Sequence, residues 1–240
     1  MRSTLVLAAK ELKQIFLSPI AYAFLMVFVF FVTFMFFRAF FLVGEASMAG
    51  FFFWIPLAFA LVIPGITMRA WPEERKQGTI EFLLTSPVET GQIVVAKFLA
   101  ALVLVACALA LTLFVPYTVA RFGDLDPGPV LGGYLGALLL GGTCISIGMF
   151  CSSFTQDQIV AFLVSVITLL GLVLLGFDYF QSEFGAKSTI GAIVRVVSPT
   201  THFEQIGRGV IDVRNLWYFG ATIVLFLYLN ARVIDLRRWR

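Results

Sequence analysis

The sequence predicts an all-α, polytopic membrane protein with six transmembrane helices. Hydrophobic residues make up 60% of the 240-residue chain and charged residues only 13%, whereas soluble domains are roughly 45–50% apolar and about 25% charged. The mean hydropathy is +0.97, and the apolar residues gather in long runs that charged residues separate. One membrane domain over residues 1–240 accounts for the whole chain.

The charges and cysteines exclude several other classes of protein. The net charge of +3 is too small to indicate nucleic-acid binding, and the basic residues lie at the ends of apolar runs, next to the expected lipid headgroups. Cys107, Cys144 and Cys151 lack the spacing of a disulfide framework or a metal site. We therefore expect this chain to bind no cofactor or metal.

Residues 1–19 predict an amphipathic helix ahead of the first span. Apolar residues such as Leu12 and Ile15 recur at helical spacing among Lys10 and Glu11. Such a helix is expected to lie along the membrane surface. The apolar run that follows is too long for the core of a signal peptide, so no cleavage is expected.

Six apolar runs are long enough to cross a bilayer, whose hydrocarbon core of about 30 Å needs about 20 residues of helix. They cover residues 20–43, 51–68, 94–120, 130–150, 159–177 and 216–234. The fourth run carries a stripe of small residues, with Gly132 and Gly136 four apart and Gly133, Ala137 and Gly141 beside them. Such a stripe predicts a close helix–helix contact, within one chain or between two.

The distribution of basic residues predicts the orientation. With the N-terminus in the cytoplasm, eleven of the seventeen Lys and Arg residues fall on the cytoplasmic side and six on the other side. Cytoplasmic loops carry an excess of Lys and Arg. Both termini are therefore predicted to be cytoplasmic.

The densest polar segment of the chain, residues 69–93, forms the loop between the second and third spans. The second helix is predicted to continue through Glu74 and to stop near Gly78, and Thr79 can then cap a short helix. In that helix the predicted apolar face is Ile80, Leu83 and Leu84, and the predicted polar face is Glu81 and Thr85. This apolar face can dock into a groove on a partner protein or rest on lipid, and both readings stay open.

The same loop contains a predicted start for the third span. Ser86, Pro87 and Glu89 have the spacing of an N-cap, a proline at the first helical position and a glutamate at the third. The short helix would therefore be bracketed by Gly78 and Pro87.

The connection over residues 178–215 is too long for a simple turn. It predicts two short helical pieces that dip into the membrane from the outer face, since neither could span it. Thr201 and Glu204 have capping-box spacing after Pro199, and Gly209 is expected to follow the end of that helix. His202, the single histidine, is expected to make a polar contact there. The hairpin could form a lid over a pathway or pack against the span ends.

The sequence contains no motif typical of nucleotide binding, ion coupling or catalysis. A phosphate-binding loop of the form Gly-x-x-x-x-Gly-Lys-[Ser/Thr] does not occur in the sequence. An ion-coupled carrier is disfavoured because no Asp or Glu lies in the middle of a predicted span. An intramembrane enzyme is disfavoured because no catalytic constellation accompanies His202.

The string Glu74-x-x-x-Gly78-Thr79-x-Glu81-x-Leu83-Leu84-Thr85-x-Pro87 resembles the coupling-helix signature of ABC-2 type transporter permeases. The N-terminal amphipathic helix resembles the elbow helix of that family, and the outer hairpin resembles its re-entrant helices. The strings at 198–203 and 208–212 are similar to the branch of gliding-motility-associated permeases. The resemblance covers nearly the whole chain.

This resemblance implies a permease subunit of an ATP-driven exporter in the prokaryotic plasma membrane. It implies a second permease copy, in a homodimer or a heterodimer, and a separate ABC ATPase subunit that binds ATP and Mg. The residues of the string, with Ile80, would dock the ATPase and would act mechanically. An extracytoplasmic accessory protein and a role in gliding or envelope export are also suggested, but no substrate is.

Overall fold

The computed structural model describes residues 2–43, 47–76, 78, 89–177, 195–209 and 212–238. Within these ranges all regular structure is helical, which confirms the all-α fold class. The helices are α1 (Arg2–Leu17), α2 (Pro19–Val43), α3 (Ala49–Thr67), α4 (Pro72–Lys76), α6 (Thr90–Leu111), α7 (Phe114–Phe122), α8 (Pro127–Ser153), α9 (Gln158–Leu174), α12 (Pro199–Gly207) and α13 (Val213–Arg238).

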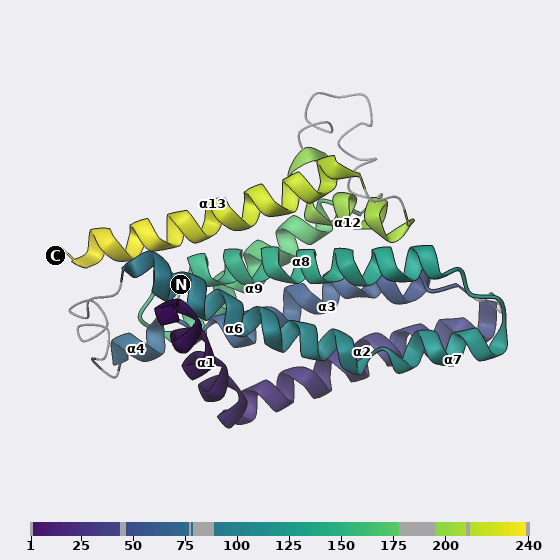
Figure 1. Cartoon of the computed structure of the whole chain (residues 1–240), viewed down its shortest axis with the longest axis horizontal. Coiled ribbons are helices and arrows are strands. Elements are labelled where there is room, and N and C mark those ends of the chain that lie inside the picture. Colours follow the sequence, from purple (N-terminus) through teal and green to yellow (C-terminus); the bar gives the residue numbers. More distant parts are fainter. Residues whose placement is uncertain are drawn as a thin grey trace.

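The long helices run along one bundle, and the two ends of the chain lie at the same end of it (Figure 1). Helices α1 and α4 lie at this end, which we call the terminal end. Helices α7 and α12 lie away from it, toward what we call the opposite end. The two helices that flank residues 79–88, α4 and the start of α6, therefore lie at the terminal end, and α12, which precedes α13, lies toward the opposite end.

Five segments of the described chain are long and apolar enough to cross a membrane. They are Pro19–Leu42, Ala49–Lys76, Thr90–Phe122, Pro127–Ser153 and Val213–Leu236. The remaining predicted span, over residues 159–177, corresponds to α9, an apolar helix of 17 residues. At 1.5 Å per residue such a helix measures about 25 Å, slightly less than a typical hydrocarbon core. The total of six spans stays a prediction.

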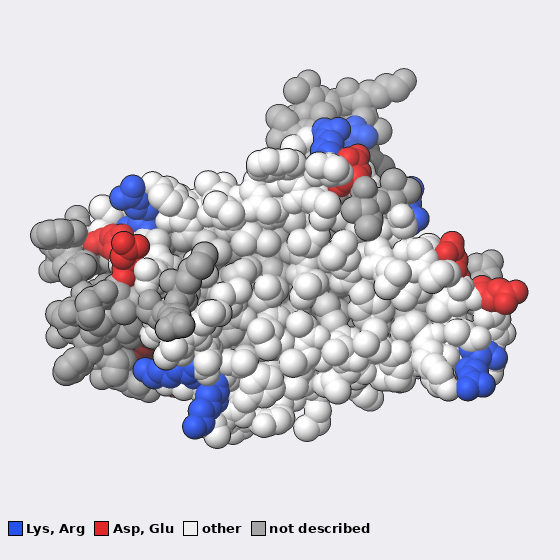
Figure 2. All heavy atoms as spheres, viewed as in Figure 1, with Lys and Arg blue, Asp and Glu red and all other residues white. Residues whose placement is uncertain are grey.

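Charged side chains gather toward the two ends of the molecule and on the part that projects near α12 (Figure 2). The band between them on the face shown is almost free of acidic and basic residues. Helix α2 also exposes large apolar side chains along its length, including Met26 and Phe30. An uncharged band between two charged ends is the surface expected of a protein that spans a bilayer.

Helix α8 is the central helix of the bundle, and it packs against α3, α6, α9, α12 and α13. The predicted stripe of small residues makes these contacts within the chain. A Cβ atom on Gly132 would overlap the carbonyl oxygen of Ile206 in α12, and one on Gly141 would lie 2.8 Å from a methyl carbon of Val105 in α6. Glycine at these positions lets the helix backbones approach more closely than any side chain would allow.

The predicted span over residues 94–120 lies within the membrane-crossing segment Thr90–Phe122, but this segment is divided into two helices. Helix α6 ends at Leu111 and α7 begins at Phe114. Thr112 lies at this break, where its side-chain hydroxyl donates to the carbonyl of Leu109 at 2.7 Å. Its backbone N–H donates to the same carbonyl at 3.0 Å. The backbone between α6 and α7 therefore forms one tight turn with i to i−3 hydrogen bonds.

The starts of α6 and α12 also differ from the prediction. Glu89 has the extended backbone of an N-cap and not the third position of a helix, and α6 begins at Thr90. Helix α12 begins at Pro199 after Ser198 as N-cap, so Thr201 lies inside the helix and does not cap it. In both cases a tertiary contact accompanies the observed start, as described below.

The close packing of α8 predicts that a methyl group added at a tight glycine lowers the stability of the protein, whereas one added at an open glycine does not. We expect Gly132→Ala to lower the stability of the detergent-purified protein by about 1–3 kcal/mol, because the Ile206 backbone cannot move aside cheaply. Gly171→Ala in α9 is the matched control, since a Cβ there meets no atom within 4 Å. Thermal unfolding midpoints measure both effects, and equal midpoints for the two variants would contradict the packing described.

Candidate functional site

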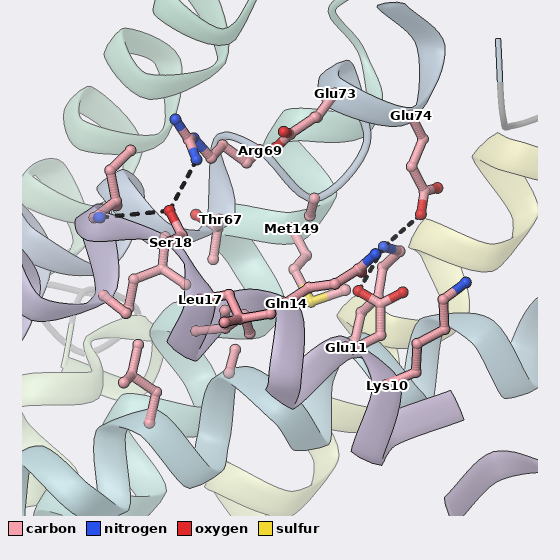
Figure 3. Close-up of a pocket in the computed structure, with 18 of the residues that line it drawn as sticks. Lys10, Glu11, Gln14, Leu17, Ser18, Thr67, Arg69, Glu73, Glu74 and Met149 are labelled. Carbon is pink, nitrogen blue, oxygen red and sulfur yellow. Dashed lines mark hydrogen bonds and ion pairs between the residues drawn. The ribbon is translucent and has the colours of Figure 1, made fainter. Parts of the chain in front are cut away.

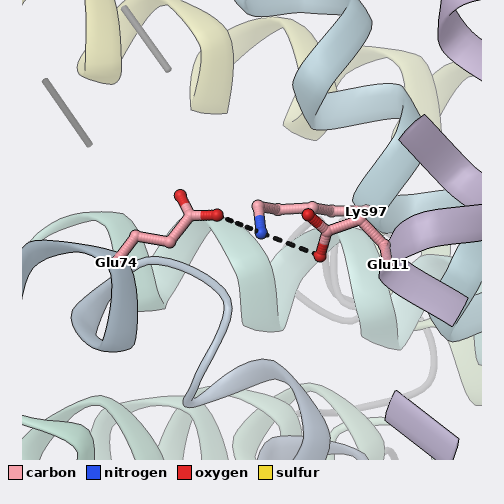
Figure 4. Close-up of polar contacts among 3 residues, drawn as sticks. All are labelled: Glu11, Glu74 and Lys97. Carbon is pink, nitrogen blue, oxygen red and sulfur yellow. Dashed lines mark hydrogen bonds and ion pairs between the residues drawn. The ribbon is translucent and has the colours of Figure 1, made fainter. Parts of the chain in front are cut away.

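A buried group of three charged side chains joins three helices at the terminal end (Figure 4). The Lys97 ammonium of α6 lies 3.0 Å from Glu11 Oε2 of α1 and 2.6 Å from Glu74 Oε1 of α4. The side chains of Lys97, Glu11 and Glu74 are only 8%, 15% and 14% exposed. We call these three residues the ion triad.

The local sequence explains why these side chains meet. Lys97 lies about two turns into α6, on the side that packs against α1. Helix α3 ends at Thr67, and a turn that contains Trp71 redirects the chain into α4. The Trp71 side chain is buried, and the Lys97 ammonium lies 5.6 Å from the centre of its ring. An indole face attracts a cation, so Trp71 helps to hold Lys97 between the two carboxylates.

The electrostatics of the ion triad favour a fixed arrangement of its three helices. Removal of charged groups from water is costly, and their mutual attraction repays the cost only when the geometry is good. Loss of one partner then leaves a buried charge without compensation. The ion triad therefore resists separation of α1, α4 and α6.

A second contact fixes α4 to the end of α8. The Arg75 guanidinium donates to the carbonyl oxygens of Ser153, at 2.8 Å, and Thr155, at 3.1 Å. Ser153 is the last residue of α8, where backbone carbonyls lack partners inside the helix and carry partial negative charge. Arg75 supplies the donors that this helix end needs.

The other flank of the loop is anchored to the last helix. The Thr90 hydroxyl, at the start of α6, donates to Asp235 Oδ1 of α13 at 2.6 Å. This contact fixes the observed beginning of α6. The residues on both sides of the predicted docking helix are thus tied to the bundle, one side through α4 and the other through α6 and α13.

The structure describes two of the nine predicted docking residues. Glu74 belongs to the ion triad. Gly78 is exposed with φ +67°, a conformation that favours glycine, and its N–H donates to the Arg75 carbonyl at 3.3 Å. This confirms Gly78 as the stop after α4. Outside the described residues lie Thr79, Ile80, Glu81, Leu83, Leu84, Thr85 and Pro87, and the short helix they would form stays a prediction.

The predicted polar contact of His202 is confirmed. Its Nδ1 lies 2.8 Å from Asn215 Oδ1, its Nε2 lies 3.3 Å from the Val196 carbonyl oxygen, and its ring stacks on Tyr218 with centroids 4.0 Å apart. These contacts join α12 to α13. His202 is thereby a packing residue of the opposite end.

The other residues predicted for this hairpin lie on or beside α12. Pro199 begins α12, and Thr201 and Glu204 lie half-buried within it. Gly209 has φ +85° and its N–H donates to the Ile206 carbonyl at 3.0 Å, so it follows the helix end as predicted. Ser198 and Thr200 donate to the carbonyls of Leu172 and Val173, which fixes the start of α12 against the end of α9. The part of the hairpin at 178–194 lies outside the described residues.

Sequence reasoning missed Lys97, Glu11 and Arg75. Lys97 entered the prediction only as one of the basic residues counted for orientation. A lysine inside an apolar run is costly and usually paired, which was a usable signal for a buried partner. Among the described residues no group of three or more His, Cys, Asp or Glu could hold a metal ion.

Replacement of Lys97 tests the ion triad. In Lys97→Met two carboxylates stay buried without their cation, so we expect a loss on the order of 3–5 kcal/mol, measured by thermal unfolding in detergent. The triple variant Glu11→Gln, Glu74→Gln, Lys97→Met has no charge left in the triad and should recover much of this loss. A triple variant less stable than Lys97→Met alone would count against the electrostatic account.

Comparison with known proteins identifies the family of this bundle. A family model described as ABC-2 family transporter protein matches residues 37–232, which includes α3 to α12 and most of α13. A search of curated proteins gave no match. Because the family model covers well over half of the sequence, the chain belongs to the ABC-2 family of transporter proteins.

Proposed function

We propose that this chain is the permease subunit of an ATP-driven ABC exporter. The family supports a membrane subunit that associates with an ABC ATPase. In this proposal ATP and Mg are bound by that separate subunit, and the chain is not an enzyme. The terminal end faces the cytoplasm, as the excess of Lys and Arg residues predicts, and the resemblance to ABC-2 type permeases implies a prokaryotic plasma membrane.

The anchoring of the loop flanks carries the proposal. A segment that receives force transmits it only if its attachments are stiff, because a slack tether would absorb the displacement. The segment 79–88 continues into α4 on one side, which the ion triad and Arg75 tie to α1, α6 and α8. On the other side it continues into α6, which Thr90 ties to α13. A push on the segment would therefore act on four helices of the bundle.

The predicted apolar face of this segment is the proposed point of contact with the ATPase. Ile80, Leu83 and Leu84 would fill a groove on that subunit, while Glu81 and Thr85 would face its rim. Closure of the ATPase around ATP would then move α4 and α6 together. The proposal also includes a second permease copy, an accessory protein on the other side of the membrane, and membership of the gliding-type branch.

Two single substitutions in the loop test this proposal. We expect Glu81→Lys and Leu84→Asp each to weaken co-purification of the permease with its co-expressed ABC ATPase partner, by roughly 30-fold or more if each is a central contact residue. The membrane fold should be retained, as judged by size-exclusion elution and thermal unfolding.

Asp124→Lys is the matched charge reversal, at an exposed position between α7 and α8. It should leave ATPase association unchanged. Normal association of both loop variants would remove the docking assignment.

A further inference from the structure

We propose that a pocket beside the ion triad binds the phosphoethanolamine headgroup of a phospholipid from the adjoining membrane leaflet. The pocket has a volume of about 540 Å³ and is lined by residues of α1, α2, α3, α4, α6 and α8 (Figure 3). Nothing in the proposed coupling to an ATPase requires it, and the two proposals can fail separately.

The pocket lies at the depth of lipid headgroups. Ser18 and Ile20 line it where α2 begins, and Thr67 and Arg69 line it where α3 ends. The ends of apolar spans mark the boundary between hydrocarbon and headgroups. Leu17, beside the same pocket, is 74% exposed, as expected for a side chain in contact with lipid. A phosphate group of the adjoining leaflet is therefore within reach.

Arg69 provides the group that would bind a phosphate. Its Nη1 donates to Ser18 Oγ at 3.1 Å, while its Nε is buried with no hydrogen-bond partner among the described residues. Arg69 takes part in neither of the ion pairs that the described residues form. A buried donor without an acceptor is costly, and a guanidinium matches the oxygen geometry of a phosphate.

The charge of the lining favours a zwitterionic headgroup over a plain anion. The lining is formally neutral, because it contains three basic side chains and three acidic ones. The basic residues are Lys10, Arg69 and Lys97, and the acidic residues are Glu11, Glu73 and Glu74. Lys97 is already paired with Glu11 and Glu74. The positive charge of Lys10 also acts on Glu74. Arg69 and Glu73 then remain, four positions apart in sequence, and they match the phosphate and the ammonium of phosphoethanolamine. A ligand with no net charge preserves the balance.

The apolar part of the lining explains why the ligand is a lipid. Leu7, Ile15, Leu17, Ile20 and Ile66 line the same pocket, and each keeps part of its hydrocarbon surface exposed. A soluble phosphate would leave this surface unused, whereas the glycerol backbone and the first carbons of an acyl chain would cover it. Burial of such apolar surface is favourable in proportion to its area.

Lipid-dependent thermal stability of the purified permease tests the inference. We expect added phosphatidylethanolamine to raise the unfolding midpoint. Phosphatidylglycerol should raise it less, and diacylglycerol with the same chains should not raise it. An equal response to diacylglycerol would exclude a headgroup site. An equal or larger response to phosphatidylglycerol would overturn the assignment of a zwitterionic headgroup. An equal response to soluble glycerophosphoethanolamine would show that the ligand need not be a membrane lipid, and would overturn that part of the proposal.

Substitutions locate the response in this pocket. Arg69→Gln should need roughly tenfold or more phosphatidylethanolamine for the same shift, and Glu73→Gln should abolish the preference for phosphatidylethanolamine over phosphatidylglycerol. Arg121→Gln, an exposed arginine near the opposite end, is the control and should respond like the parent. Native mass spectrometry of the unmodified chain gives a second readout, with retained phosphatidylethanolamine expected. A parent-like response of Arg69→Gln, or no retained lipid, would overturn the proposal.

Discussion

A single buried lysine determines how the terminal end is assembled. Lys97 carries its charge into a helix that is otherwise apolar, and its environment is acceptable only because Glu11 and Glu74 reach it from two other helices. The requirement to neutralise this charge fixes α1 and α4 on α6. Arg75 then extends the assembly to the end of α8, and Thr90 joins it to α13. The loop between α4 and α6 thus starts and ends on attached helices.

The rest of the bundle gives this assembly a firm support. At its closest contacts helix α8 has glycine and so contributes no side chain of its own, as at Gly132 against α12 and Gly141 against α6. Close-packed interiors transmit displacement instead of absorbing it. At the opposite end His202 and Tyr218 join α12 to α13. A movement at the terminal end can therefore reach the far side of the bundle through α8 and α13, as the proposed permease function needs.

Features that depend on local chemistry could be predicted from the sequence. Apolar run lengths located five membrane-crossing segments, and Gly78 and Gly209 were recognised as residues that follow helix ends. Features that depend on distant contacts were missed or misplaced. Lys97 and Glu11 are 86 positions apart and Thr90 and Asp235 are 145 apart, so no local pattern announces either pair. Thr201 and Glu89 fit capping patterns, but the contacts of Thr200 with α9 and of Thr90 with α13 set the helix starts.

The distance between spin labels on α1 and α4 tests the anchoring role of Lys97 most directly. Lys13→Cys and Lys76→Cys place labels at exposed positions of these helices, in a background where Cys107, Cys144 and Cys151 are replaced. With Lys97 present, pulsed electron paramagnetic resonance should give one narrow distance distribution. In Lys97→Met the distribution should broaden, because α4 loses its charged contact with α1 and α6. Identical distributions in the two proteins would contradict the central claim that Lys97 holds the loop flank in place.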